Sequence, residues 1–194
     1  MNSIVNFFAK APQKFSGSAK ELGKIQSIVI IAMFLALRVV LGMFGNFQLS
    51  FFPYAKLGFM FLPIALTSYY FGPVCSMVVA VAGDVLSYLM APPAASFTPG
   101  ITAGYLLEGM VVGLILYKEN ITVTRTAVSQ VVATIIGGLA INTYFIYLIY
   151  GLTYLQVLGL RAVILIPWCI VEVAIIVIIV KTLDRVPMIK KIIS

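Results

Sequence analysis

Residues 25–44 read IQSIVIIAMFLALRVVLGMF, and Arg38 is the only charged residue among them. A transmembrane helix needs about 20 predominantly apolar residues, so this stretch predicts a membrane span. A charged side chain inside hydrocarbon costs several kcal/mol and usually faces other polar groups or a polar cavity. Because Asp84, Glu108 and Glu172 lie in other apolar stretches, the sequence favours a membrane protein that binds or moves a solute.

The composition of the whole chain indicates the same class. The chain has 194 residues, of which 62% are hydrophobic and 10% are charged, whereas soluble domains are typically about half apolar and a quarter charged. We expect an all-α fold in which residues 25–183 form one membrane domain of six transmembrane helices, between an N-terminal segment (1–24) and a basic tail (184–194). The first two spans are predicted at 25–44 and 57–70. The third runs from the break at 71–73 to residue 90, and the fourth from the loop at 99–100 to residue 117. The last two are predicted at 127–149 and 161–183.

Basic residues outside these spans predict the topology. With six spans, most of them fall on one side of the membrane: Lys10, Lys14, Lys20, Lys24, Lys118, Arg125, Lys181, Arg185, Lys190 and Lys191. The opposite loops contain only Lys56 and Arg161. The positive-inside rule then places both termini in the cytoplasm. We interpret the net charge of +7 as a topology signal and an attraction to anionic lipid, and not as a nucleic-acid-binding surface.

The N-terminal segment has two open interpretations. Apolar residues occur there beside Lys10 and Lys14, which suggests a segment lying on the inner membrane surface; the apolar residues are Ile4, Val5, Phe7, Phe8 and Phe15. A disordered tail is the alternative.

Several polar residues of different spans fall in the same outer half of the membrane. Helical spacing groups Asp84 with Tyr88, and Thr102 with Tyr105 and Glu108. With Arg38, Asn142 and Arg161 they predict a pocket that opens to the exterior. The structural alternative is that Arg38, Asp84, Glu108 and Glu172 pair with one another and hold the helices together.

Ala32 and Ala36 form a second pattern in the first span. Small residues four apart allow another helix to approach closely. At 100° per residue, Arg38 points away from the face that these two alanines share. One helix therefore offers a smooth face to a partner and a charge to a pocket.

Other features exclude several functions. Histidine is absent, and no phosphate-binding loop, metal-ligand spacing or nucleophile motif occurs. Cys75 and Cys169 lie in apolar stretches and are predicted to be small core residues. We therefore expect neither an enzyme nor a cofactor or metal site.

The order of these features resembles the substrate-binding (S) subunits of bacterial energy-coupling-factor (ECF) vitamin transporters, most closely the folate-type branch. The resemblance extends over about residues 24–181. It rests on four stretches: 32–41; 57–66 followed by Phe71-Gly72-Pro73; 97–102 leading to 113–118; and 141–143 with Tyr150-Gly151 and then Arg161.

The resemblance implies a multi-pass protein of the bacterial cell membrane whose outer loops close over one vitamin. It also implies that Ala32 and Ala36 contact a transmembrane coupling (T) subunit, and that two separate ATPase subunits power transport. In the family, the S subunit is thought to reorient in the membrane and so carry its site from outside to inside.

Capture of a folate is the first hypothesis. Asp84 could accept hydrogen bonds from the pterin, Asn142 could donate and accept, and Phe97 and Tyr105 could stack on the ring. Arg38, Arg161 or Lys56 could bind the tail carboxylates, and Thr98 beside Phe97 completes the predicted set. The alternatives are another vitamin such as pantothenate, and a secondary transporter that uses Asp84 or Glu108 for proton coupling.

Overall fold

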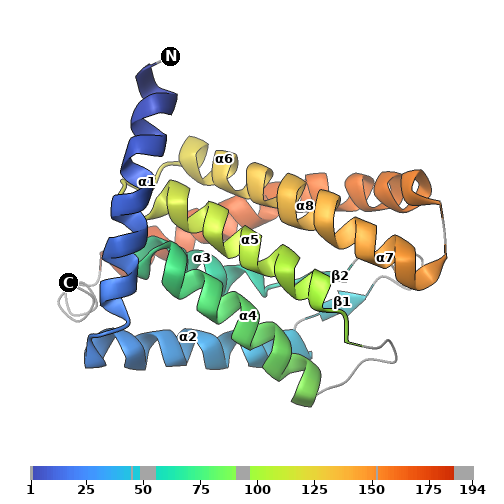
Figure 1. The fold of residues 1–194 in the computed structure, drawn as a ribbon, viewed down its shortest axis with the longest axis horizontal. Coiled ribbons are helices and arrows are strands. Elements are labelled where there is room, and N and C mark those ends of the chain that lie inside the picture. Colours follow the sequence, from blue (N-terminus) through green and yellow to red (C-terminus); the bar gives the residue numbers. More distant parts are fainter. Residues whose placement is uncertain (1, 45, 49–55, 91–96, 152, 186–194) are drawn as a thin grey trace.

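The computed structural model describes residues 2–44, 46–48, 56–90, 97–151 and 153–185 (Figure 1). Most helices run along the long axis of a bundle, and one helix, α1, crosses an end of it. The elements are α1 (Asn2–Glu21), α2 (Ile25–Phe44), β1 (Asn46–Gln48), β2 (Lys56–Gly58), α3 (Phe61–Phe71), α4 (Pro73–Met90), α5 (Pro99–Leu116), α6 (Val123–Ala133), the π-helix η1 (Thr134–Asn142), α7 (Thr143–Tyr150) and α8 (Tyr154–Asp184).

The described helices confirm an all-helical membrane fold, with one span shorter than predicted. Five segments are long and apolar enough to cross a membrane: Ile25–Met43, Pro73–Met90, Pro99–Leu116, Val123–Ile149 and Tyr154–Asp184. The remaining predicted span, the second along the chain, corresponds to α3. This helix has 11 residues and covers about 16 Å at 1.5 Å per residue. That is roughly half of the ~30 Å hydrocarbon core.

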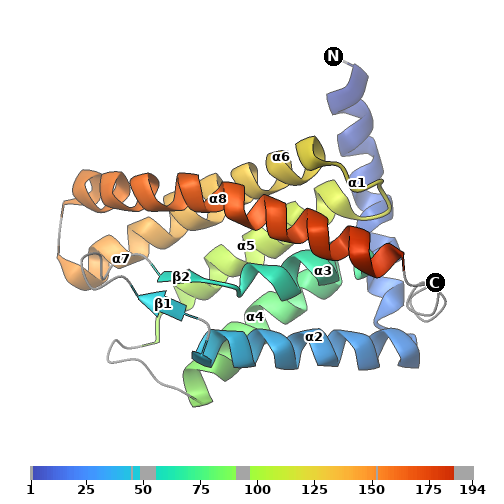
Figure 2. The same ribbon diagram turned by 180° about the vertical axis from the view of Figure 1, so that it is seen from behind.

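The predicted helix at 57–70 is wrong in its first turn, where the chain forms a strand instead. β2 pairs antiparallel with β1, with Asn46 opposite Gly58 and Gln48 opposite Lys56. This pairing satisfies backbone N–H and C=O groups that a helix would satisfy internally. The strands lie at the end of the bundle opposite α1 (Figure 2).

The fifth and sixth spans also differ from the prediction. The fifth span is helical throughout, but nine of its residues, Thr134–Asn142, form a π-helix. Each turn of a π-helix is wider than a turn of an α-helix. The sixth, α8, begins at Tyr154, about two turns before the predicted start at residue 161. Arg161 therefore lies inside α8, where its side chain is buried, and not in a loop at the membrane edge.

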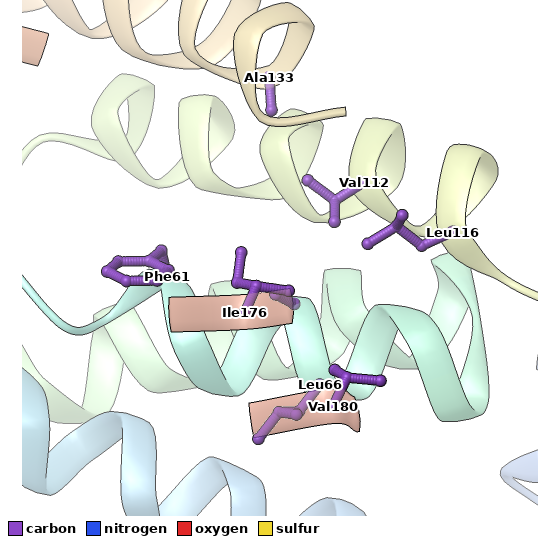
Figure 3. Packing of buried hydrophobic residues seen from close by; sticks show 8 residues of the cluster. Phe61, Leu66, Val112, Leu116, Ala133, Ile176 and Val180 are labelled. Atoms are coloured by element: carbon purple, nitrogen blue, oxygen red, sulfur yellow. The ribbon is translucent and has the colours of Figure 1, made fainter. Parts of the chain in front are cut away.

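The main hydrophobic cluster joins α3, α5, α6 and α8 (Figure 3). Its buried members are Phe61, Ala65, Leu66, Val112, Leu116, Ala133, Ile176 and Val180. Cys75 and Cys169 are buried free cysteines that pack in two smaller clusters, as predicted for core residues.

Glycines of α5 let neighbouring helices approach closely. A Cβ at Gly113 would lie 2.5 Å from the Pro73 Cα, and a Cβ at Gly109 would lie 3.0 Å from the Ser76 carbonyl oxygen. Without a hydrophobic driving force between helices in lipid, such close backbone contact is a principal source of helix association. It fixes α4 against α5.

The N-terminal segment is a helix, so the alternative of a disordered tail is wrong for residues 2–21. Ser18 is fully buried and its Oγ accepts the backbone N–H groups of Val74 (3.0 Å) and Cys75 (3.2 Å). These N–H groups belong to the first turn of α4, which has no intrahelical partner for them. A side chain of α1 thus caps another helix.

A cluster of charges attaches α1 at a second point. Lys14 Nζ donates to the Leu114 carbonyl (2.9 Å) and pairs with Glu119 (3.3 Å), which also binds Arg125 (2.7 Å). Partial burial raises the pKa of Glu119, but the hydrogen bonds from Arg125 and Lys14 outweigh burial and hold the pKa below its ordinary value. The charges link α1 to the α5–α6 connection.

We expect Ser18→Ala to destabilise the protein, because two buried N–H groups of α4 would lose their acceptor. Loss of a helix cap typically costs about 1 kcal/mol. Thermal unfolding in detergent measures the change, and Ser16→Ala, at an exposed position two residues away, is the matched control. Equal melting temperatures for both variants would show that the cap does not contribute.

Apart from Lys56 in β2, the basic residues described outside the spans gather at the end of the bundle where α1 lies. They lie on α1, on the α5–α6 connection and at the end of α8 (Figures 1 and 2). The orientation of this end in the membrane, and the boundaries of the three predicted regions, stay predictions. Of the basic tail, residues 186–194 lie outside the described residues.

Candidate solute-binding site

Arg38 lies inside the bundle, with only 1% of its surface exposed. Its Nη1 donates to the Met60 carbonyl (3.0 Å), just before α3. Its guanidinium carbon lies 5.0 Å from the centre of the Tyr105 ring of α5, within range of a cation–π contact. The Arg38 Nε and Nη2 groups are buried without a hydrogen-bond partner. A buried donor without a partner costs free energy, so these two groups are available to a ligand.

Gly83 makes room for Arg38 on the surface of α4. A Cβ at Gly83 would lie 2.4 Å from Arg38 Cδ and 2.7 Å from Nε. Only glycine allows the arginine to lie directly on the helix backbone at this point. Gly83 was not predicted as a site residue, although its position next to Asp84 was a usable signal.

Asp84 is joined to α5 by a hydrogen bond and not to Arg38 by an ion pair. Thr102 Oγ1 donates to Asp84 Oδ2 at 2.6 Å. Asp84 and Glu108 are near enough to act electrostatically on Arg38, but no ion pair within 4 Å joins them in the described part of the chain. The described ion pairs involve Lys14, Lys24 and Arg125, at the α1 end. The alternative in which the buried charges pair as a structural support is therefore wrong.

Asn142 lies at the end of the π-helix, opposite α5. Its side chain is buried, and its Oδ1 has no hydrogen-bond partner. A Cβ at Gly104 would lie 2.0 Å from this oxygen, and a Cβ at Gly137 would lie 2.8 Å from the Gly104 carbonyl oxygen. The close contact of η1 with α5 thus depends on two glycines, and it brings the amide of Asn142 into the bundle.

Arg161 lies against the same π-helix from the side of α8. Its Nη2 donates to the Gly138 carbonyl (3.1 Å), which also accepts from the Thr143 hydroxyl (3.3 Å). The structure therefore places Arg161 beside the segment that carries Asn142. Sequence spacing could not indicate this carbonyl, because no residue type marks a π-helix.

The remaining predicted residues, Phe97, Thr98 and Lys56, lie at the same end of the bundle. Phe97 is 40% exposed, and its ring centre lies 5.1 Å from that of Tyr88. Thr98 is the N-cap residue of α5, without a side-chain cap hydrogen bond. Lys56 pairs with Gln48 in the two-stranded sheet, and its side chain lies outside the described residues. Their roles stay predictions.

A second polar group lies between α6 and α8. Gln130 Nε2 donates to Glu172 Oε2 (3.1 Å), and Gln130 Oε1 is buried without a partner. Trp168 lies one turn from Glu172 on α8, with its ring 6.2 Å from that of Phe59. Gln130 was not predicted, because an uncharged residue near the end of a span carries little signal in a sequence.

We expect Gly83→Ala to weaken ligand binding without changing any charge. The new methyl group would displace the Arg38 side chain from α4, and overpacking of this kind costs about 1–3 kcal/mol, which corresponds to roughly 5- to 150-fold in affinity if the cost falls on the bound state. Isothermal titration would measure the loss. The matched control is Ala82→Gly on the same helix, and equal affinities for Gly83→Ala and the wild type would contradict the role of Gly83.

Five described helical segments are apolar and long enough to cross a membrane, which defines a multi-pass membrane protein. The helices surround buried polar groups whose hydrogen bonds are incomplete, as expected of a protein that binds a polar solute. The family model "ECF transporter, substrate-specific component" matches residues 26–183, and the chain belongs to this family. It is therefore a non-enzymatic transport protein, whose partners are a vitamin and the ECF module.

Curated relatives support the same assignment. The folate transporter FolT of Clostridium novyi (strain NT) is 27% identical over 128 residues, which cover 66% of this chain and 72% of that protein. The riboflavin transporter RibU of Staphylococcus aureus (strain TCH60) is 31% identical over 136 residues, covering 66% and 68%.

Two solved structures share the fold. A crystal structure of FolT bound with folic acid has a TM-score of 0.68 at 24% identity and covers 77% of this chain and 88% of that one. A structure of the S component of a bacterial ECF transporter has a TM-score of 0.52 at 25% identity and covers 81% and 92%.

Proposed function

We propose that this protein captures a folate at the site around Arg38 and delivers it through a T subunit and two ATPase subunits. The observation that carries the proposal is the buried Arg38, whose Nε and Nη2 have no hydrogen-bond partner. A guanidinium with two unused donors suits a carboxylate or a ring carbonyl with adjacent acceptors. The FolT relative favours folate as the ligand with these groups.

The other polar groups suit a ligand that both donates and accepts hydrogen bonds. Among the described residues, Asn142 Oδ1 has no donor. The Asp84 carboxylate receives a hydrogen bond from Thr102 and can accept several. The amino and ring N–H groups of a pterin fit such acceptors. The Tyr105 ring lies against Arg38 and so orients the guanidinium. Stacking on the ligand would use what remains of the surface of this ring.

A flavin is the second candidate, because the RibU relative is 31% identical. Riboflavin also carries a flat ring with donors and acceptors, but it has no carboxylate to neutralise Arg38. The two ligands therefore differ in the demand they place on this charge. Pantothenate has the carboxylate but no ring to lie beside Tyr105.

Titration of the purified protein with folic acid, riboflavin and pantothenate tests the proposal. The single tryptophan, Trp168, reports folic acid and pantothenate by fluorescence, and thermal shift covers all three, because a tight ligand raises stability by mass action. Saturation by folic acid at nanomolar concentration, with no response to the others, is the expected result. A response to riboflavin alone would replace the ligand, and no response to any vitamin would overturn the site.

A further inference from the structure

Helix α1 lies across one end of the bundle, transverse to the long axis along which the spans run (Figures 1 and 2). A bundle that spans a bilayer has its long axis along the membrane normal, so α1 runs along the membrane plane. Its first residues project past the bundle beyond α6 (Figure 1). The helix therefore extends over lipid that surrounds the protein.

The side of α1 that faces the bundle is defined by its contacts. Lys14 binds the Leu114 carbonyl and Glu119, and Ser18 caps α4. Between them, the Cα of Gly17 faces Tyr117, whose hydroxyl oxygen lies 3.5 Å from an ideal Cβ at that position. The exposed positions lie on the other side: Pro12, Gln13, Ser16, Ala19 and Lys20.

Helical register extends the bundle-facing line toward the N-terminus. Steps of three and four residues lead back from Ser18 and Lys14 to Ala11, Phe7 and Ile4. Beyond the edge of the bundle, this line faces the same direction, which is the interior of the bilayer. The register thus predicts apolar residues at the positions nearest the acyl chains, as in helices that bind in the membrane interface.

We propose that α1 is a membrane-binding helix that lies on an anionic lipid surface beside the bundle, at the end where the basic residues gather. Lys10 and Lys20 lie on α1, and Lys24 follows its C-terminal end. Anionic headgroups attract such residues within a Debye length. Ser18 and Lys14 attach the helix to α4 and α5, so the depth of α1 sets the depth of the bundle. This inference does not depend on which vitamin is bound.

Spin labels on the full-length protein in liposomes test the proposal. Cys75 and Cys169 are buried, so an added surface cysteine is labelled selectively. We compare Phe7→Cys, on the predicted lipid-facing line, with Ser16→Cys, at an exposed position on the other side. The expected result is a several-fold higher ratio of oxygen to water-soluble nickel collision rates at position 7 than at position 16.

Lipid composition and charge are the second variable. In vesicles that contain phosphatidylglycerol, Lys10→Gln with Lys20→Gln should reduce the difference between positions 7 and 16, as should vesicles of phosphatidylcholine alone. Equal water accessibility at both positions in anionic vesicles would overturn the proposal. So would a label at position 7 that becomes immobilised only when the T subunit and ATPases are added, since the partner would then be protein.

Discussion

Arg38→Gln is expected to weaken vitamin binding by about 30-fold or more, because loss of a buried, charge-paired hydrogen bond costs about 2–5 kcal/mol. In the ligand-free protein, Arg38 is buried with two unpartnered donors and without an ion pair within 4 Å among the described residues, so its removal deletes a buried charge that is only partly compensated. The melting temperature without ligand should therefore stay the same or rise. Isothermal titration and thermal unfolding of one preparation measure both quantities.

Two further variants make the Arg38 result specific. Arg38→Lys keeps the charge but loses the planar fork of donors, so it should bind with intermediate affinity. Lys181→Gln removes a cation from an exposed position near the C-terminal end of α8, and this variant should bind the vitamin like the wild type. If Arg38→Gln keeps wild-type affinity, the site lies elsewhere. If its melting temperature falls sharply instead, Arg38 acts mainly as a structural residue.

Ala32→Trp and Ala36→Trp are expected to abolish most transport while vitamin binding by the purified subunit is unchanged. Both alanines lie on the exposed side of α2, whereas Arg38 on the same helix is buried. Overpacking at a close helix contact costs about 1–3 kcal/mol, which corresponds to roughly 5- to 150-fold weaker association. Uptake of labelled vitamin with the T and ATPase subunits co-produced measures transport, and titration measures binding.

Val131→Trp is the matched control for this experiment. The Val131 side chain is also exposed, but it belongs to α6, which lies across the bundle from α2 (Figure 1). This variant should transport like the wild type. Loss of vitamin binding in Ala32→Trp would contradict the separation of the two faces, and normal transport would place the T-subunit contact elsewhere.

Local sequence information was sufficient for much of the fold. Apolar length identifies α2, α4, α5 and the fifth span, and Gly72, with a φ of 87°, makes the predicted break before Pro73. The grouping of Arg38, Asp84 and Tyr105 was also predictable, because a charged side chain in hydrocarbon usually faces other polar groups. Each of these conclusions depends on one segment at a time, or on depth, which residue counting provides.

The sequence by itself determined the class of protein, the membrane segments, the opposite faces of α2 and the end of the bundle where polar residues gather. The tertiary structure decided the partner of each polar group. Asp84 binds Thr102 and not Arg38, Gly83 seats the arginine, and the Gly138 carbonyl receives Arg161. The π-helix and the paired strands β1 and β2 also appear only there. The physical reason is that these features depend on contacts between segments distant in the chain, and apolar helices in lipid carry little periodicity to indicate which sides will meet.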